Sequence, residues 1–315
     1  MLIKHLLEDG DKNKEEYNTL IERIANSEYF NEMYGKQLQT IEPEDLENEN
    51  LVNEFNNMFR GSKKYETPYV VITPYGDNRV PTDTSIEIHK YVNMLSKEKF
   101  NVPIRNLIFA DKSIVVASEY GNPYVLFPLG DYRLFYSEGV KDFTARYNTD
   151  TDVTFSIINE ILLKYRDDYD DMVMESLSDT FETYELDYQN MKTFDKSLKK
   201  MIRKMAAEYF KDPDNTDNVK QSDIKILEKR FYESAKEIFK QFSNYVKQIE
   251  TTKSMHDIDN EEIMIQSDEI VGIYTEDFNN MLAKILEIKK GSSWPFFVLH
   301  LKYFVRLYYK LCINA

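Results

Sequence analysis

The sequence predicts an α+β protein, in which a small mixed β core is combined with long helical regions. Residues 14–58 and about 153–250 carry apolar side chains three and four positions apart, which is typical of helices. Between them, residues 67–137 form short β-rich runs separated by Gly, Pro, Asp and Asn. Residues 262–274 return to a strand pattern, and two isolated strands would have no sheet to join. We therefore expect the second helical region to be an insertion into one α+β domain.

These changes of pattern divide the chain into four parts. They are an N-terminal helical arm (1–62), an α+β core in two pieces (63–150 and 256–290), a large helical insertion (151–255) and a C-terminal apolar helix (291–315). Lys302, Arg306 and Lys310 interrupt the last part too often for a membrane span. We expect it to be buried or to form an interface, and an amphipathic membrane contact is the alternative.

The core itself is predicted element by element. Its strands are expected in the runs "TPYVVITP", "RNLIFAD", "SIVVAS", "PYVLFPL" and "YRLFYS". A helix over 85–98 lies between the first two runs and opens with a capping box, Thr84-x-x-Glu87. The later run "EEIMIQSDEIVGIY" predicts two more short strands, joined by a turn at 266–268.

Composition limits the classes of function. The formal net charge of −15 over 315 residues opposes broad nucleic-acid binding, although a local basic site remains possible. An acidic imitation of DNA fits the same charge, but the irregular spacing of acids in 165–187 argues against it. One cysteine and four scattered histidines exclude a disulfide framework and a cysteine-rich zinc site, and no metal is expected. The N-terminus shows no signal peptide, so the protein is expected in a cytoplasm rather than secreted.

Familiar catalytic motifs are absent, since the chain has no Walker loop, GxGxxG, HExxH, CxxC or GxSxG. The remaining candidate is Arg79, which ends a β run and is followed by a proline and the capped helix. It is either an ordinary surface charge or a ligand for an anion, which the nearby helix N-terminus would also favour. Arg105 competes for the anion role, and its alternative is a salt bridge to Asp83 or Asp111.

The order of elements carries a resemblance. Arg79 closes a strand, and "PIRNLIFADKSIVVASEYGNPYVLFP" gives a strand, a turn, a helix-like Ala-x-x-Tyr-Gly step and another strand. Much later, Glu262 directly precedes the strand "IMI". In this order the chain resembles the ADP-ribosyltransferases of the arginine, Ser-Thr-Ser, glutamate type. The resemblance covers 67–142 and about 256–276 and implies NAD as the substrate that donates ADP-ribose.

The resemblance also implies roles for individual residues. Arg79 would grip the phosphate and ribose of NAD, Asn106 would lie on the strand that supports the nicotinamide pocket, and Tyr120 would offer an aromatic face to the ring. Glu262 would be the catalytic glutamate that stabilises the oxocarbenium-like charge. Asn260, two positions before it, would help to position the acceptor. The chain departs from the family pattern where Asn106 begins Asn-Leu-Ile instead of Ser-Thr-Ser, and where Asn260 replaces a glutamate.

A second resemblance, carried by "RVPTDTSIEIHKYVN" and the core runs after it, is to uncharacterised proteins of large tailed bacteriophages. Together the resemblances imply a phage-encoded mono-ADP-ribosyltransferase that modifies a host macromolecule during host takeover. The alternative is a non-enzymatic protein on a degenerate version of the same fold, with the helical insertion as its docking surface. Its partners would then be host proteins or virion proteins, and it would be found in the host cytoplasm or the virion.

Overall fold

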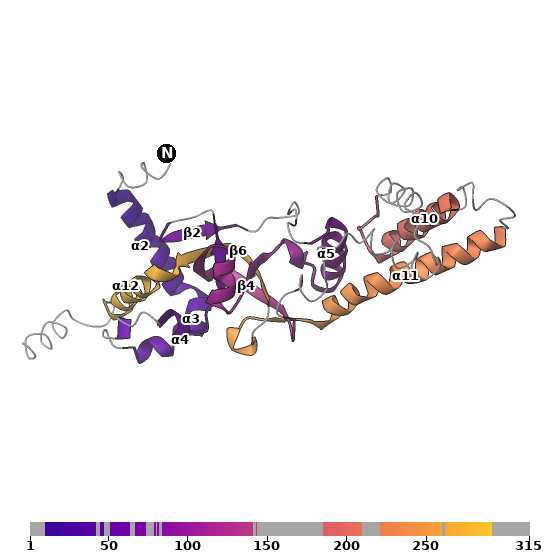
Figure 1. Ribbon diagram of the computed structural model, residues 1–315. Coiled ribbons are helices and arrows are strands. Elements are labelled where there is room, and N and C mark those ends of the chain that lie inside the picture. Colours follow the sequence, from indigo (N-terminus) through magenta and orange to yellow (C-terminus); the bar gives the residue numbers. More distant parts are fainter. Residues whose placement is uncertain are drawn as a thin grey trace, which may run out of the picture.

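The computed structural model describes residues 10–41, 45–46, 51–63, 67–73, 79, 81, 84–140, 143, 185–209, 221–259 and 262–291. In this part of the chain, eight α-helices accompany one curled antiparallel sheet, which confirms the α+β class. The molecule is elongated (Figure 1): helices near the chain's N-terminus gather at one end of the sheet, and a pair of long helices extends from the other end.

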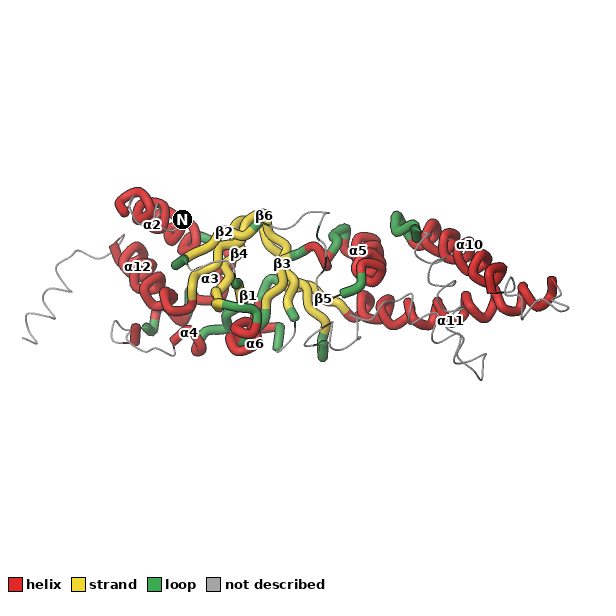
Figure 2. Tube along the Cα trace, turned by 45° about the horizontal axis from the view of Figure 1, so that its top comes forward, coloured by secondary structure: helices red, strands yellow, loops and turns green. Residues whose placement is uncertain are grey.

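The sheet has six strands. They are β1 (Phe59–Ser62), β2 (Tyr69–Ile72), β3 (Ile108–Ala110), β4 (Asn122–Ser137), β5 (Ile249–Thr252) and β6 (Ile263–Tyr274). The long strands β4 and β6 pair in the centre, β1 and β5 pair with β4, and β2 and β3 pair with β6 (Figure 2). Every pairing is antiparallel, so the expectation of a mixed β core is corrected to an antiparallel one. β5 and β6 follow the long helices, so the helical region is inserted within the sheet's own sequence.

Two predicted turns are absent from the central strands. "PYVLFPL" and "YRLFYS" form the single strand β4, and "IMIQSDEIVGIY" forms the single strand β6. Between the pairs Leu129 with Glu269 and Tyr132 with Ser267, two residues of β4 face one residue of β6, which is a β-bulge. Gly130 in the bulge has φ +74°, a left-handed conformation that favours glycine. The polar residues read as a turn therefore lie opposite a bulge.

The sheet curls until two of its edges meet. Beyond β3, Asp111 forms an isolated bridge with Phe59 of β1, with both backbone N–H groups donating at 2.7 and 2.9 Å. Arg60 also donates to the carbonyl of Phe109 at 2.8 Å. These contacts fix the curvature, because they join β3 and β1 although neither is the neighbour of the other in the strand order.

The run "SIVVAS" forms a helix, α6 (Ile114–Glu119), and the prediction of a strand there is wrong. β3 and β4 both run antiparallel to β6 and hence parallel to each other, and parallel strands need a crossover connection, usually helical. The Ser113 side chain caps this helix by accepting from Val116 N–H. Gly61 and Gly121 let it lie against β1, since a Cβ on Gly61 would stand 1.9 Å from the carbonyl oxygen of Ala117.

One face of the sheet is covered by helices from both ends of the described chain. They are α2 (Gly10–Asn26), α3 (Glu28–Tyr34), α4 (Leu51–Glu54) and α12 (Phe278–Gly291). The core beneath them is rich in aromatic rings; Phe30 stacks on Tyr34 at 4.7 Å, and Tyr29 meets Tyr132 edge-on at 5.4 Å. Residues assigned to an N-terminal arm thus cover the sheet and supply β1.

A second core lies between the sheet and the helices α5 (Ile86–Phe100), α10 (Met191–Tyr209) and α11 (Gln221–Gln248). Alternate residues of one strand serve the two cores: Phe135 faces the second, and Leu134 faces the first. Ser85, not Thr84, caps α5, because the Ser85 side chain accepts from Ile88 N–H. The N-cap therefore lies one residue later than predicted, and the capping box is wrong because the residue three positions after Ser85 is Ile88.

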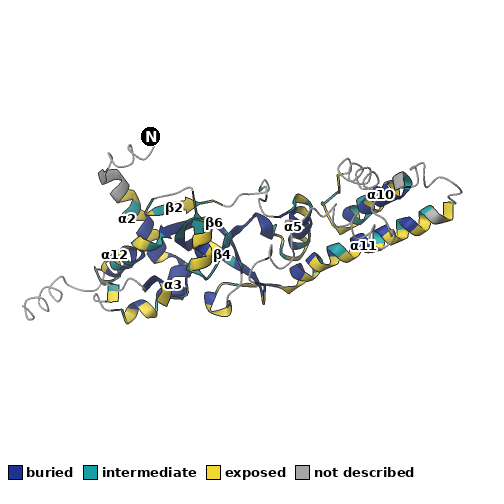
Figure 3. Cartoon of the chain, viewed as in Figure 1, coloured by how far each residue is buried: buried dark blue, intermediate teal, exposed yellow. Residues whose placement is uncertain are grey.

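We call α10 and α11 the helical hairpin, because their apolar faces pack on each other while their outer faces are exposed (Figure 3). Lys99 of α5 holds the end of α11: its ammonium donates to the carbonyls of Val246, Lys247 and Ile249 at 2.9–3.0 Å. Burial lowers the pKa of Lys99 below its ordinary value. We call the sheet, the helices that cover it and α5 the sheet unit, and the hairpin joins it at this capped end of α11.

Candidate functional site

The arginine cluster, which consists of Thr84, Arg79, Arg105, Phe109 and Glu262, lies at the start of β3. The Arg79 side chain lies beside the residues that precede β3, and its Nη1 donates to the carbonyls of Arg105 and Leu107 at 2.9 and 3.2 Å. Its guanidinium carbon lies 4.4 Å from the centre of the Phe109 ring. Arg79 thus binds main-chain acceptors that the sheet does not use.

Arg105 is the buried centre of the cluster, with a side chain only 4% exposed. Its Nη1 lies 3.2 Å from Oε1 of Glu262, and its Nη2 donates to the Thr84 hydroxyl at 3.2 Å. The Phe109 and Phe143 rings flank the guanidinium at 4.6 and 4.5 Å. The Arg105 Nε–H finds no acceptor among the described residues. A charge buried this deeply depends on its carboxylate partner.

Glu262 stands immediately before β6 and is 21% exposed, so water reaches one side of the carboxylate. Its backbone N–H donates to the carbonyl of Val140, three residues after the end of β4, with an N···O distance of 3.4 Å. β3 and β6 pair antiparallel with Ala110 opposite Ile263, so Glu262 lies beyond the C-terminal end of β3. The Arg105 side chain reaches it past the Phe109 ring. The salt bridge of Arg105 is thus to Glu262, a partner 157 positions away, which the local alternatives Asp83 and Asp111 did not include.

Asn106 belongs to a buried polar network on the α5 side. Its Oδ1 accepts from Nδ2 of Asn93 at 2.8 Å and lies 2.9 Å from Nε2 of His89. Oδ1 of Asn93 accepts from the backbone N–H of Arg105, which fixes the orientation of that amide. Nε2 of His89 also lies 3.1 Å from Nδ2 of Asn93, so this nitrogen faces both a donor and an acceptor. This network orients the backbone that carries Arg105.

The other predicted residues lie apart or are outside the described chain. Tyr120 follows the last residue of α6 and is 57% exposed. The next residue, Gly121, lies against Ser62 and Lys63 at the end of β1. Asn260 lies outside the described residues, as do 151–184 of the expected insertion and 292–315 of the expected C-terminal helix. The structure therefore brings Arg79 and Glu262 to the same arginine, with Asn106 behind it and Tyr120 on another element.

Sequence reasoning gave Arg105 only second place and did not include Thr84 or Phe109 in the cluster. Thr84 was assigned to the predicted capping box instead. Phe109 was counted only as a strand residue, although an aromatic residue two to four positions from an arginine can offer its ring face to the guanidinium. No local pattern links Arg105 to Glu262, because the contact depends on the pairing of β3 with β6.

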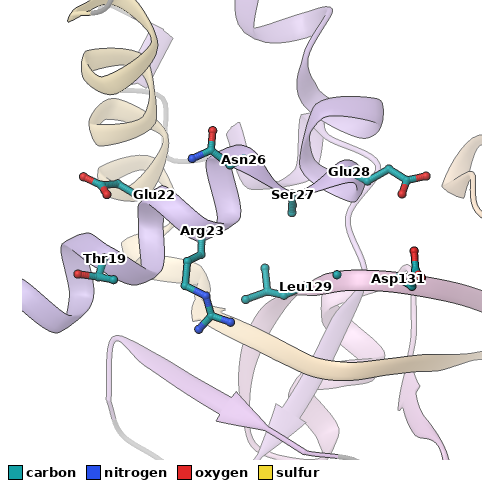
Figure 4. Close-up of a pocket in the computed structure, with 9 residues that line it drawn as sticks. Thr19, Glu22, Arg23, Asn26, Ser27, Glu28, Leu129 and Asp131 are labelled. Carbon is teal, nitrogen blue, oxygen red and sulfur yellow. The ribbon is translucent and has the colours of Figure 1, made fainter.

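A shallow pocket of about 620 Å³ lies elsewhere, between the α2–α3 junction and the bulge of β4 (Figure 4). Its lining is formed by Thr19, Glu22, Arg23, Asn26, Ser27, Glu28, Leu129, Gly130 and Asp131. Arg23 points across it to Glu269, with donor distances of 3.0 and 2.6 Å, and these hydrogen bonds lower the pKa of Glu269. Glu28 is paired with Lys253 at 2.9 Å. The pocket contains none of the predicted site residues.

Within the described residues, no group of three or more His, Cys, Asp and Glu side chains could hold a metal ion. None of the helices in that part of the chain is both long and apolar enough to cross a membrane. No protein-family model, curated protein or solved structure matches the chain.

Proposed function

We propose that the chain is a non-enzymatic docking protein, in which the sheet unit is a scaffold and the helical hairpin presents the binding surface. The observation that carries this proposal is the state of the arginine cluster. Arg79 is bound to the carbonyls of Arg105 and Leu107, and Glu262 is bound to the buried guanidinium of Arg105. The two side chains best suited to handle NAD are engaged in holding the start of β3.

The energetic argument concerns Glu262 and Arg105. Among the described residues, Glu262 is the only acidic partner of Arg105. To hydrogen-bond a ribose hydroxyl, its carboxylate would have to leave Arg105 or divide its hydrogen bonds between the two groups. Removing one partner from a buried pair destabilises a protein by roughly 3–5 kcal/mol. Arg79 would likewise have to release two main-chain carbonyls before its donors could surround a phosphate. Both requirements favour a structural role.

Mono-ADP-ribosyl transfer from NAD is the second candidate, and one observation favours it. Arg79 and Glu262 lie far apart in the sequence, yet both contact Arg105, and the guanidinium groups of Arg79 and Arg105 share the Phe109 ring. Two guanidinium groups beside one carboxylate leave a local excess of positive charge, which suits a diphosphate. In this candidate Glu262 would stabilise the developing charge at the ribose.

NAD turnover separates the two candidates. The purified chain is incubated with NAD labelled in the adenylate phosphate, and nicotinamide release, label transfer to host-cell extract and the thermal shift caused by NAD are measured. We expect no release, no transfer and no shift. Nicotinamide release that is lost in Glu262→Ala and kept in Glu269→Ala would overturn the docking proposal. Glu269 is the matched control, because it is also paired with an arginine and lies within β6, the strand that Glu262 precedes.

The bacteriophage resemblance supports a partner in the virion or in the infected cell. Co-sedimentation of the chain with particles of a phage that encodes it, in the absence of NAD turnover, is the expected result for a virion-associated docking protein.

A further inference from the structure

The helical hairpin has the opposite charge to the rest of the molecule. α10 and α11 carry twelve Lys and Arg residues against six Asp and Glu, whereas the whole chain has 40 against 55. The two helices therefore have a net charge of +6 in a protein whose net charge is −15. All twelve basic side chains are exposed. This segregation gives the acidic protein one basic surface.

The basic residues are also aligned. On α11, five lysines fall on one stripe because their spacing alternates between four and seven positions: Lys225, Lys229, Lys236, Lys240 and Lys247. On α10, four basic residues spaced four, three and four positions apart also fall on one face: Lys192, Lys196, Lys199 and Arg203. At 1.5 Å per residue, the α11 stripe is about 33 Å long, close to one turn of a nucleic-acid duplex.

The two stripes lie on the same side of the hairpin. Lys199 of α10 and Lys236 of α11 both lie over the ring of Tyr232, at 5.0 and 5.3 Å. Arg203 of α10 reaches Glu228 of α11 at 3.5 Å along the same seam. Since packed helices lie about 8–10 Å apart, the stripes form a double row of positive charge.

Acidic neighbours reduce this charge only in part. Lys199 pairs with Asp195 at 2.6 Å, and two other stripe lysines have a glutamate at 3.2 and 3.8 Å on their own helix. Burial raises the pKa of Asp195, but hydrogen bonds from Lys199 and Tyr232 outweigh this effect and lower it, so the carboxylate stays ionised at neutral pH. Exposed pairs of this kind are weak, and an incoming phosphate can compete with them.

The apolar residues of the hairpin indicate which polyanion fits. A helix that binds a membrane surface needs an exposed apolar face to insert among the lipids. Here the apolar faces are buried against each other, as Phe194, Leu198, Phe231 and Phe239 show. Among the side chains of the two helices that the structure describes, the exposed large apolar ones are Met191 and Ile226. Ten of the twelve basic residues are lysines, which contact phosphates as point charges without reading bases.

We propose that the double row of basic side chains on α10 and α11 binds the phosphate backbone of a nucleic-acid duplex without sequence preference. This inference rests on the docking role proposed above and names its partner. The sheet unit, with its excess of acidic residues, would repel the same backbone, so the contact is confined to the projecting hairpin.

The test is binding of a labelled duplex of ~24 base pairs, followed by fluorescence anisotropy from about 50 to 300 mM salt. Two unrelated sequences, a duplex RNA and a single strand form parallel arms. The hairpin variant is Lys192→Glu, Lys196→Glu and Lys225→Glu; the control is Lys36→Glu, Lys63→Glu and Lys97→Glu, three exposed lysines of the sheet unit. Both variants change the net charge equally, and circular dichroism checks that both are folded.

We expect the two DNA sequences to bind equally well, with affinity falling steeply as salt rises. The hairpin variant should lose at least about tenfold in affinity, and its salt slope should fall by about 2–3. The control should keep the wild-type slope. The duplex that binds more tightly, DNA or RNA, identifies the type of nucleic acid that the hairpin prefers.

Four outcomes overturn the inference. They are no binding at about 50 mM salt, equal losses in the two variants, binding only to vesicles containing phosphatidylserine, and self-association that the hairpin variant abolishes in the absence of nucleic-acid binding. None of these outcomes overturns the docking role, although its partner would then be different or not identified. The docking role is overturned by Glu262-dependent NAD turnover, which is measured in a separate assay.

Discussion

Arg105 in the sheet unit and Lys196 on the hairpin carry the same charge in opposite surroundings. Arg105 is buried between two aromatic rings and paired with Glu262, whereas Lys196 is exposed on the surface of α10. The sheet unit uses its arginines to join β3, β6 and α5, and the hairpin leaves its lysines facing solvent. Arg79 and Glu262, which the sequence singled out, therefore contact Arg105 and its backbone, whereas the lysines of the helical surface face solvent.

The largest expected effect tests whether the core of the hairpin and the core under the sheet unfold independently. Phe231→Ala removes a fully buried ring from the hairpin core and should lower the free energy of unfolding by about 4 kcal/mol. Amide hydrogen exchange should rise in α10 and α11 while β4 and β6 remain protected. Phe278→Ala, an equally buried ring under the sheet, is the control and should raise exchange in β4 and β6 instead. Identical exchange patterns in the two variants would show that the regions unfold as one unit.

The structural role of the arginine cluster predicts the next effect. Arg105→Met leaves the Glu262 carboxylate without its partner and should lower the free energy of unfolding by about 3 kcal/mol, measured by urea denaturation. The double variant with Glu262→Gln should recover at least half of that loss, because it removes both charges. A double variant as unstable as Arg105→Met alone would contradict the buried pair as the cause.

The junction between the regions depends on Lys99. Lys99→Met removes the donor from three carbonyls at the end of α11 and should cost about 1 kcal/mol. Exchange should increase in the last turn of α11, at 245–248. Lys97→Met, which alters an exposed lysine of the same helix, should leave that turn unchanged; an equal increase would show that any charge lost from α5 has this effect.

The smallest effect concerns Arg23 and Glu269. Arg23→Met should lower the free energy of unfolding by about 0.5 kcal/mol at pH 7, since the pair is partly exposed. The hydrogen bonds from Arg23 lower the pKa of Glu269 from its ordinary value of 4.5 in the folded state. The stabilisation is therefore complete above that ordinary value and is lost as the pH falls through the lower folded-state pKa. A difference between variant and wild type that persists unchanged at low pH would exclude this ion pair as its origin.

Long periodic segments were the most predictable part of the fold. The helices at 86–100, 191–209 and 221–248 were expected from apolar spacing, because each buries one face in a core. The prediction of α6 as a strand was wrong, since β-branched residues favour strands locally but the crossover from β3 to β4 requires a helix there. The turns predicted inside β4 and β6 were wrong because a bulge accommodates the polar residues.

The candidate site was predictable only in part. The sequence singles out Arg79 and Glu262 by their positions at strand ends, and both occupy the arginine cluster. Their partner Arg105 could be noticed but not paired, because the register of β3 against β6 is a tertiary property. The alignment of lysines on α10 and α11 is fully visible in the sequence, but which side of each helix faces the other becomes known only from the contacts at Tyr232.

In the part of the chain that the structure describes, the hairpin contacts the sheet unit at one end and projects from it. α11 contacts the sheet unit from Phe239 onwards, through the ring of Tyr91 and the cap provided by Lys99. The stretch from Gln221 to Phe239 then extends about 27 Å, so a tilt of about 10° at the anchor moves the tip by about 5 Å. Any change of tilt at the anchor would therefore displace the outer lysines much farther than the residues at the base.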